Sequence, residues 1–144
     1  MIRPATADDA DAMAALHVRS ARRAYAELIE PEVLAQIDER TLAQRLREAI
    51  DEPDRRGWVW DQNGTIAGYA ALVGDDLRLL YVDPVAQRAG VGTALLRHAR
   101  EHGARVLRVL AGNAPARAFY EHQGWVPHGD GEPWEGHPTV LYRC

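Results

Sequence analysis

Gly90 and Gly92 stand where an apolar strand pattern, Leu77–Val82, is expected to turn into an amphipathic helix. Glycine has no side chain, so a ligand can approach the backbone closely at both positions. The first N–H groups of a helix lack internal partners, and the helix dipole adds partial positive charge there. This chemistry suits a diphosphate, to which the neighbouring Arg88 can add a charge-assisted hydrogen bond.

Two common nucleotide-binding motifs can be compared with the turn Gln87–Thr93. A P-loop requires a lysine after its second glycine, and this sequence has Thr93 there. A dinucleotide-binding loop has a third glycine where Leu95 stands, and an acidic residue at the end of the next strand, where Leu110 and Ala111 stand. Neither motif is present. The turn is therefore a phosphate site of another kind, or a glycine turn that only shortens the connection.

A second pair of candidates, Asn113 and Tyr120, lies in the helix expected after the next strand. Asn113 is a favourable N-cap, Pro115 suits the first helical turn, and Gly124 supplies a stop. Tyr120 follows Asn113 by about two helical turns, so both side chains can face one cleft. Phe119 points to a different face and is expected in the core. Simple capping by Asn113 and simple packing of Tyr120 remain the alternatives.

The remaining patterns predict the elements that hold these residues. Strands are expected at Ile2–Pro4, Trp58–Trp60, Ile66–Val73, Leu77–Val82, Arg105–Leu110 and Thr139–Arg143, and further helices at Met13–Ala24, Pro31–Ile37 and Leu42–Ile50. Thr6 with Asp9 resembles a capping box, and Asn63-Gly64 is typical of a tight hairpin turn. The segment from His128 to Pro138 is rich in glycine, proline and charge, and we expect a long surface loop there. The order predicts an α/β (α+β) fold with a mixed, mostly antiparallel sheet.

Composition limits the classes of protein that the chain can represent. Its 144 residues, 47% hydrophobic and 26% charged, are expected to form a single domain, residues 1–144. The formal net charge of −4 argues against a nucleic-acid partner. No apolar run is long enough to span a membrane and no leader pattern precedes the domain. The single cysteine, Cys144, cannot form an internal disulfide, and nothing indicates a metal site. A cytoplasmic protein is the expectation.

At this point the residues resemble a known family. The segment QRAGVG, after the strand ending LLYVDP, is similar to the acyl-CoA pyrophosphate signature of the GNAT superfamily of N-acetyltransferases. The segment NAPARAFYEHQGW resembles the Asn…Tyr helix of the same superfamily. The likeness is specific across residues 77–125, and the element order agrees over nearly the whole chain.

The resemblance implies a fold, a co-substrate and roles for individual residues. Acetyl-CoA would lie in a V-shaped gap where Leu77–Val82 splays from Arg105–Leu110, and an acceptor amine would attack its acetyl group directly. Tyr120 would act as the general acid for the departing thiolate. The cofactor-binding residues would be Leu80, Tyr81 and Val82 along the pantetheine, Gln87, Arg88, Ala89, Gly90, Val91, Gly92 and Thr93 around the pyrophosphate, and Asn113 on the pantetheine arm.

One departure from the family pattern concerns the general base. Many relatives have a glutamate near the end of the strand before the asparagine, where this sequence has Ala111. The base must then be a water chain or another residue. The candidates are Asp75, Asp76, Glu27, His17 and His137.

The acceptor and the assembly are less well defined by the sequence. Trp58 and Trp60 share a strand face, and they are expected in the core, as is Trp125. Trp134 lies in a polar segment and is expected to cover the active site or to be buried at a dimer contact. The closing strand, Thr139–Arg143, offers an edge, so we expect a homodimer. The acceptor is expected to be a small-molecule amine. The alternatives are a protein N-terminus or lysine as the acceptor, or a binding module without catalysis.

Overall fold

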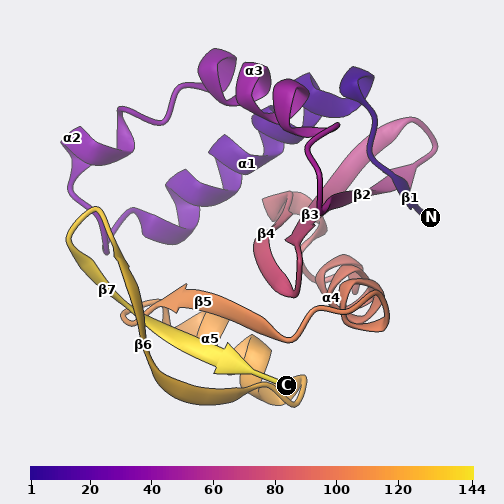
Figure 1. Cartoon of the computed structure of the whole chain (residues 1–144). Coiled ribbons are helices and arrows are strands. Elements are labelled where there is room, and N and C mark those ends of the chain that lie inside the picture. Colours follow the sequence, from indigo (N-terminus) through magenta and orange to yellow (C-terminus); the bar gives the residue numbers. More distant parts are fainter.

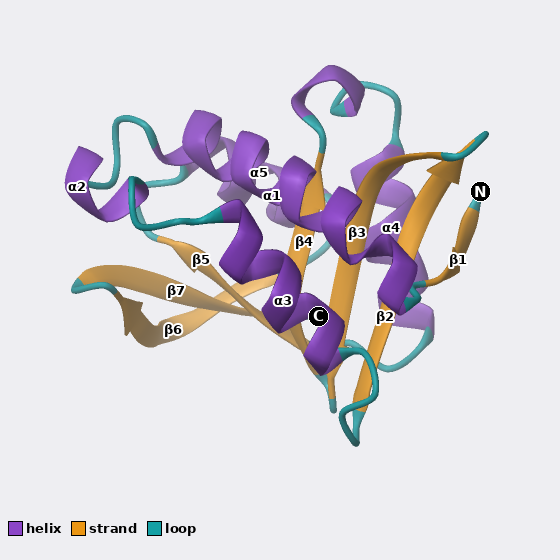
Figure 2. Cartoon of the chain, turned by 90° about the horizontal axis from the view of Figure 1, so that it is seen from above, coloured by secondary structure: helices purple, strands orange, loops and turns teal.

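The computed structural model describes residues 1–144 and contains one seven-stranded sheet in the order β1-β2-β3-β4-β5-β7-β6 (Figures 1 and 2). The strands are β1 (Ile2–Pro4), β2 (Arg55–Gln62), β3 (Thr65–Val73), β4 (Asp76–Val82), β5 (Val106–Leu110), β6 (Val126–Trp134) and β7 (His137–Arg143). Only β4 and β5 pair in parallel, and every other neighbouring pair is antiparallel. The mixed, mostly antiparallel sheet predicted from the sequence is confirmed.

Helices cover both faces of the sheet (Figure 1). They are α1 (Ala10–Tyr25), α2 (Pro31–Leu34), α3 (Glu39–Ala49), α4 (Val91–Glu101) and α5 (Ala114–His122), with short 3₁₀ turns η1 (Ala7–Asp9) and η2 (Pro84–Ala86). The helix predicted for Pro31–Ile37 is a single turn that ends at Leu34. No helix has both the length and the apolar character that a membrane crossing requires.

The core consists of two apolar clusters, one on each face of the sheet. Alternating side chains of β2 and β3 divide between them: Val59 and Tyr69 pack under α1 and α3, whereas Trp58 and Ala70 pack against α4. Trp60 packs at the margin of the α4 cluster, so the two tryptophans of β2 share a face, as predicted. Trp125 is only 1% exposed and belongs to the same cluster.

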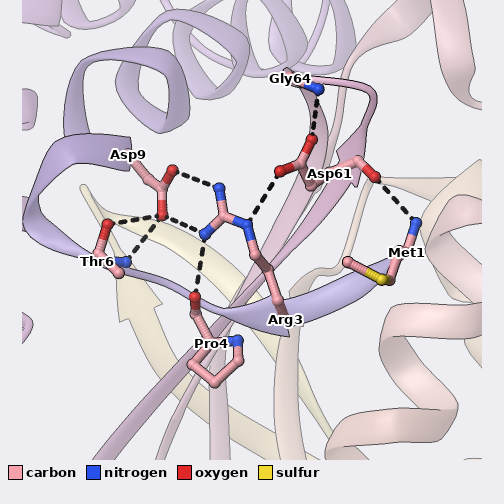
Figure 3. A network of polar contacts seen from close by, with 7 residues as sticks. All are labelled: Met1, Arg3, Pro4, Thr6, Asp9, Asp61 and Gly64. Atoms are coloured by element: carbon pink, nitrogen blue, oxygen red, sulfur yellow. Dashed lines mark hydrogen bonds and ion pairs between the residues drawn. The ribbon is translucent and has the colours of Figure 1, made fainter.

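A charged network around Arg3 ties β1 to the start of α1 and to the β2–β3 turn (Figure 3). The Arg3 guanidinium donates to both carboxylate oxygens of Asp9, at 2.8 and 2.9 Å, and to Asp61 at 3.0 Å. Asp9 also accepts from the Thr6 amide at 2.8 Å, which completes the predicted capping box. The Asp61 carboxylate accepts from the Gly64 amide at 2.7 Å, which supports the predicted Asn63-Gly64 turn.

The segment predicted as a long loop, His128–Pro138, is instead the hairpin of β6 and β7. Its turn is Glu135-Gly136, both with positive φ (48° and 79°), a conformation that glutamate rarely adopts and that the sequence therefore does not indicate. Two register irregularities interrupt β6, one after Pro127 and one after Gly131. Proline, glycine and bulges are tolerated in β6 because it is an edge strand.

The location of β7 corrects the argument for a dimer. The Thr139–Arg143 segment pairs with β5 on one side and with β6 on the other, so it is an internal strand. The edges of the sheet are β1 and β6 (Figure 2). An exposed closing strand was one of two reasons to expect a homodimer, the other being Trp134, and the first reason no longer holds.

Candidate active site

The strands β4 and β5 separate soon after they begin. Their only paired positions are Asp76 with Val106 and Leu77 with Leu107. On the other side of β4, the register with β3 slips so that Arg78 is an extra residue, a β-bulge. A bulge bends its strand and increases the local twist, which explains why β4 leaves β5 at this point. The predicted splayed pair of strands is therefore present.

The open edge of β4 presents unpaired backbone groups to the gap. The Asp83 amide donates to the Ala67 carbonyl of β3 at 2.8 Å. Because hydrogen-bonded and non-bonded positions alternate in an antiparallel ladder, the backbone groups of Leu80 and Val82 point away from β3, towards the gap. The backbone groups of Tyr81 point towards β3, so this residue faces the site with its side chain. The gap can accept an extended ligand as an additional strand.

The turn after β4 ends in a helix start with free N–H groups. Gly90 is the N-cap residue of α4 and has a left-handed backbone, with φ of 79°. The hydrogen bonds of the structure give no acceptor to the amides of Arg88, Gly90, Val91, Gly92 or Thr93, whereas the Ala89 amide donates to the Ala86 carbonyl. The Gln87 side chain turns back and donates to the Val82 carbonyl at 3.3 Å. The turn and the end of β4 thus form one backbone-lined site suited to a diphosphate.

A cavity of about 1070 Å³ begins at this gap and extends over the sheet face towards α1 and α3. The residues of the predicted site that line it are Leu80, Tyr81, Val82, Gln87, Gly92, Asn113 and Tyr120. Arg88, Ala89, Gly90, Val91 and Thr93 do not line this cavity. The structure therefore places the two sequence motifs at a common site.

Asn113 and Tyr120 reach the cavity from the two ends of α5. The Asn113 side-chain oxygen accepts from the Ala116 amide at 3.3 Å, so the residue is the predicted N-cap, and its NH₂ group remains available. Burial raises the pKa of the Tyr120 phenol, so this hydroxyl stays protonated at neutral pH. Phe119 packs against the core, as predicted, and also lines the cavity.

Tyr25, at the end of α1, is a site residue that the sequence reasoning missed. Its hydroxyl lies 3.3 Å from the hydroxyl of Tyr81, and its ring lies 5.9 Å from the ring of Trp134. The available signal was the spacing of His17, Ala21 and Tyr25, which are four residues apart on one helix face and all line the cavity. Trp134 is 37% exposed and lines the cavity as well. This position agrees with the expectation that Trp134 covers the active site.

Of the five residues considered as a general base, only His17 lines the cavity. Its Nδ1 atom lies 2.5 Å from the Tyr69 hydroxyl, and burial lowers the pKa of the imidazole to about 4. His137 is bonded to the Glu30 carboxylate at 2.9 Å. Asp76 is paired with two arginines, Arg78 and Arg108. Asp38, Glu132 and Glu135 are the carboxylates that do line the cavity, and the sequence reasoning did not consider them.

Comparison with known proteins identifies the family of the chain. The model of the Acetyltransferase (GNAT) family matches residues 15–125. The chain therefore belongs to the GNAT family, whose members are N-acetyltransferases that use acetyl-CoA, as the two sequence motifs indicated. No group of metal-ligating side chains gathers anywhere in the structure.

Individual relatives extend this picture. The peptidyl-lysine N-acetyltransferase YiaC of Escherichia coli is 35% identical over 72 residues, and the match spans about half of each protein, 49% of both. The PaiA N-acetyltransferase of Thermoplasma acidophilum, solved with coenzyme A, has a TM-score of 0.75 at 17% identity and is matched over 99% of this chain and 97% of that one. YncA of Salmonella typhimurium, solved with its cofactor acetyl-CoA, has a TM-score of 0.72 at 18% identity, over 100% and 92% of the two chains.

Proposed function

We propose that this protein transfers the acetyl group of acetyl-CoA to a primary amine of a small molecule. The observation that carries the proposal is the meeting of two features at one end of the cavity. These are the unpaired N–H of Val82 in the splayed gap and the protonated hydroxyl of Tyr120. One can bind a carbonyl oxygen and the other can donate a proton.

The residues present fit coenzyme A as a ligand. The free amides between Arg88 and Thr93 would hold the diphosphate at the positive end of α4, where Gly90 and Gly92 leave the backbone accessible. The backbone groups of Leu80 and Val82 would hold the pantetheine like a neighbouring strand, and the Asn113 NH₂ group would donate to it. Acetyl-CoA supplies a thioester, an acyl group ready for direct attack by the acceptor nitrogen.

The chain's own residues then manage the oxygen and the proton. The Val82 N–H would donate to the acetyl oxygen and stabilise the negative charge that develops there. Tyr120 would donate its phenolic proton to the sulfur as the carbon–sulfur bond breaks, and the nitrogen's proton would leave through water in the cavity. Burial lowers the pKa of His17 to about 4, which makes the imidazole a weak base at neutral pH.

A small acceptor is favoured because the far side of the cavity is bounded. The tip of the β6–β7 hairpin lies beside the connection between α1 and α2 (Figure 1), where His137 bonds to Glu30 at 2.9 Å. Trp134, near this tip, lies against Tyr25. A peptide segment would need a groove that continues past this contact.

A peptide lysine is the second candidate, because the relative YiaC is a peptidyl-lysine N-acetyltransferase. The experiment that separates the two measures thiol release from acetyl-CoA with a panel of small amines and with matched lysine peptides. The proposal predicts saturable release with small amines and much weaker release with peptides. Efficient acetylation of peptides alone would support the lysine candidate, and the absence of thiol release with every acceptor would support a binding module.

The compartment and the assembly remain predictions. The cytoplasm is proposed because acetyl-CoA chemistry and one free thiol, Cys144, both fit a reducing compartment. A homodimer, if formed, would have to use a surface other than the buried strand β7. Light scattering at micromolar concentration, with coenzyme A present, tests the dimer directly.

A further inference from the structure

Four arginines line the cavity, and one of them, Arg78, lies near the start of β4, whereas Val82 ends that strand. They are Arg45 on α3, Arg55 on β2, Arg78 on β4 and Arg108 on β5. The strand registers bring three of them to one end of the sheet, because Arg55 lies opposite Val73 and Val73 lies opposite Asp76. This end of the cavity is therefore rich in positive charge.

The arginines are only partly neutralised by neighbouring acids. Asp76 accepts from Arg78 at 3.2 Å and from Arg108 at 3.3 Å, so one carboxylate serves two guanidinium groups. The side chains of Arg45 and Arg55 make no ion pair or hydrogen bond in the structure, in contrast to Arg47, which pairs with Asp11. Arg55 is also half-buried, although a guanidinium removed from water normally has a partner.

Arg55 lies on the same face of the sheet as Tyr69, because Val59, four residues after Arg55 on β2, lies opposite Tyr69. Burial raises the pKa of the Tyr69 phenol, and the positive charge of Arg55 acts on that phenol in the opposite direction. His17, whose Nδ1 atom lies 2.5 Å from the Tyr69 hydroxyl, lines the same cavity. Arg55, which has no ion pair or hydrogen bond, therefore lines the same cavity as His17.

Carboxylates also line the cavity. They are Asp38 at the start of α3 and Glu132 and Glu135 at the tip of the β6–β7 hairpin. The Tyr81 side chain lies on β4 three residues beyond Arg78, which corresponds to about 10 Å along an extended strand. A ligand that extends from Tyr81 to the start of β4 therefore meets an aromatic group first and an arginine about 10 Å away.

We propose that the acceptor is a primary amine that carries an anionic group, a carboxylate or a phosphate, at its far end, and that Arg45 and Arg55 bind this group. The proposal rests on the proposed acetyl transfer and names its substrate class. The amine lies near Val82 and Tyr120, while the anion lies between α3 and the start of β2. Arg55 and Arg45 are specificity residues in this account and take no part in bond breaking.

The test compares acceptors of equal length that differ in charge. Thiol release is measured with aminohexanoate, with its uncharged amide, with hexylamine and with aminopentyl phosphate. We expect kcat/KM for at least one of the two anionic acceptors to exceed kcat/KM for the amide and for hexylamine by about tenfold or more. The difference should arise in KM. The better of the two anions identifies a carboxylate or a phosphate site. Equal kcat/KM for charged and uncharged acceptors would overturn the proposal.

Two variants locate the effect in the structure. Arg55→Gln and Arg45→Gln should each raise KM for the anionic acceptor about tenfold, while kcat and the KM for hexylamine change less than threefold. Arg56→Gln is the matched control, because Arg56 is the next residue of β2, bonds to the His102 carbonyl and does not line the cavity. An equal effect of all three substitutions would contradict a specific role for Arg55.

Binding measurements separate the failure of this proposal from the failure of acetyl transfer. If no amine releases thiol, the proposed function fails, and calorimetry of aminohexanoate and its amide with the coenzyme A-bound protein decides the present inference. Tighter binding of the acid, lost in Arg55→Gln and kept in Arg56→Gln, would support it. Absence of any preference for the acid would overturn it.

Discussion

His17 lies flat against the side chain of Tyr81, with the two ring centroids 3.8 Å apart and the ring planes inclined by 21°. The same imidazole is bonded through Nδ1 to the Tyr69 hydroxyl. One residue of α1 therefore supports two tyrosines of the sheet, and Tyr81 in turn meets Tyr25 at the acceptor side of the cavity. This support depends on a neutral imidazole, because burial disfavours its charged form.

The first prediction concerns pH and His17. Burial lowers the pKa of His17 from 6.5 to about 4. Between about pH 4 and pH 6.5, the unfolded chain therefore binds a proton at this residue that the folded chain does not bind. The stability that depends on neutral His17 is complete above about pH 6.5 and falls as the pH drops towards 4, with a slope of at most about 1.4 kcal/mol per pH unit. Urea unfolding of the wild type and of His17→Asn at several pH values measures it. Identical pH dependence of the two proteins would contradict the prediction.

A second prediction concerns the Arg3 network. The Arg3 guanidinium and the Thr6 amide hold the pKa of the Asp9 carboxyl below its usual value, so this contribution to stability is present above about pH 4 and is lost below it. Asp9→Asn should lower the free energy of unfolding at neutral pH by about 2 kcal/mol, since it weakens several charge-assisted hydrogen bonds. Asp11→Asn is the control, because the Asp11 carboxylate is 82% exposed and should matter by less than about 0.5 kcal/mol. Equal losses in the two variants would refute the assignment.

The third prediction tests the glycine turn. A Cβ atom added to Gly90 would meet no protein atom within 4 Å, but the φ of 79° strains most side chains, and asparagine is among those that tolerate it best. Gly90→Asn should fold normally and bind acetyl-CoA at least about tenfold more weakly, because the new side chain stands where the diphosphate would lie. Gly64→Asn is the matched control, since Gly64 has φ of 92° in the distant β2–β3 turn. If calorimetry shows the same acetyl-CoA affinity for both variants, the turn is not part of the binding site.

Sequence reasoning succeeded where the determinants are local. The Asn113 cap, the Asn63-Gly64 turn and the Thr6–Asp9 capping box all depend on residues a few positions apart. The splayed strands followed from the family resemblance. The free amides around Gly90 followed from the ordinary chemistry of a helix start.

The errors arose where distant segments meet. The β6–β7 hairpin turns at Glu135, a residue type that gives no turn signal, and β6 tolerates proline and glycine only because it lies at an edge. Tyr25 became a site residue because α1 crosses the sheet close to Tyr81, which no local pattern predicts. The arginine end of the cavity depends on strand register for the same reason.

The central claim is that Tyr120 gives a proton to the departing thiolate. General acid catalysis typically contributes about 10²–10⁴-fold, so Tyr120→Phe should lower kcat by about that factor and leave acetyl-CoA affinity within about threefold of the wild type. Tyr142→Phe is the matched control, because the Tyr142 hydroxyl bonds to Glu121 at 2.7 Å and does not line the cavity. It should keep kcat near the wild-type value.

The most direct measurement is the single-turnover rate of thiol release from acetyl-CoA by the wild type, Tyr120→Phe and Tyr142→Phe, with the best acceptor amine. Single-turnover conditions exclude product release as the limiting step. The account predicts a rate at least about a hundredfold lower for Tyr120→Phe alone, with acetyl-CoA binding by calorimetry nearly unchanged. A wild-type rate for folded Tyr120→Phe would contradict the account and would assign Tyr120 a packing role.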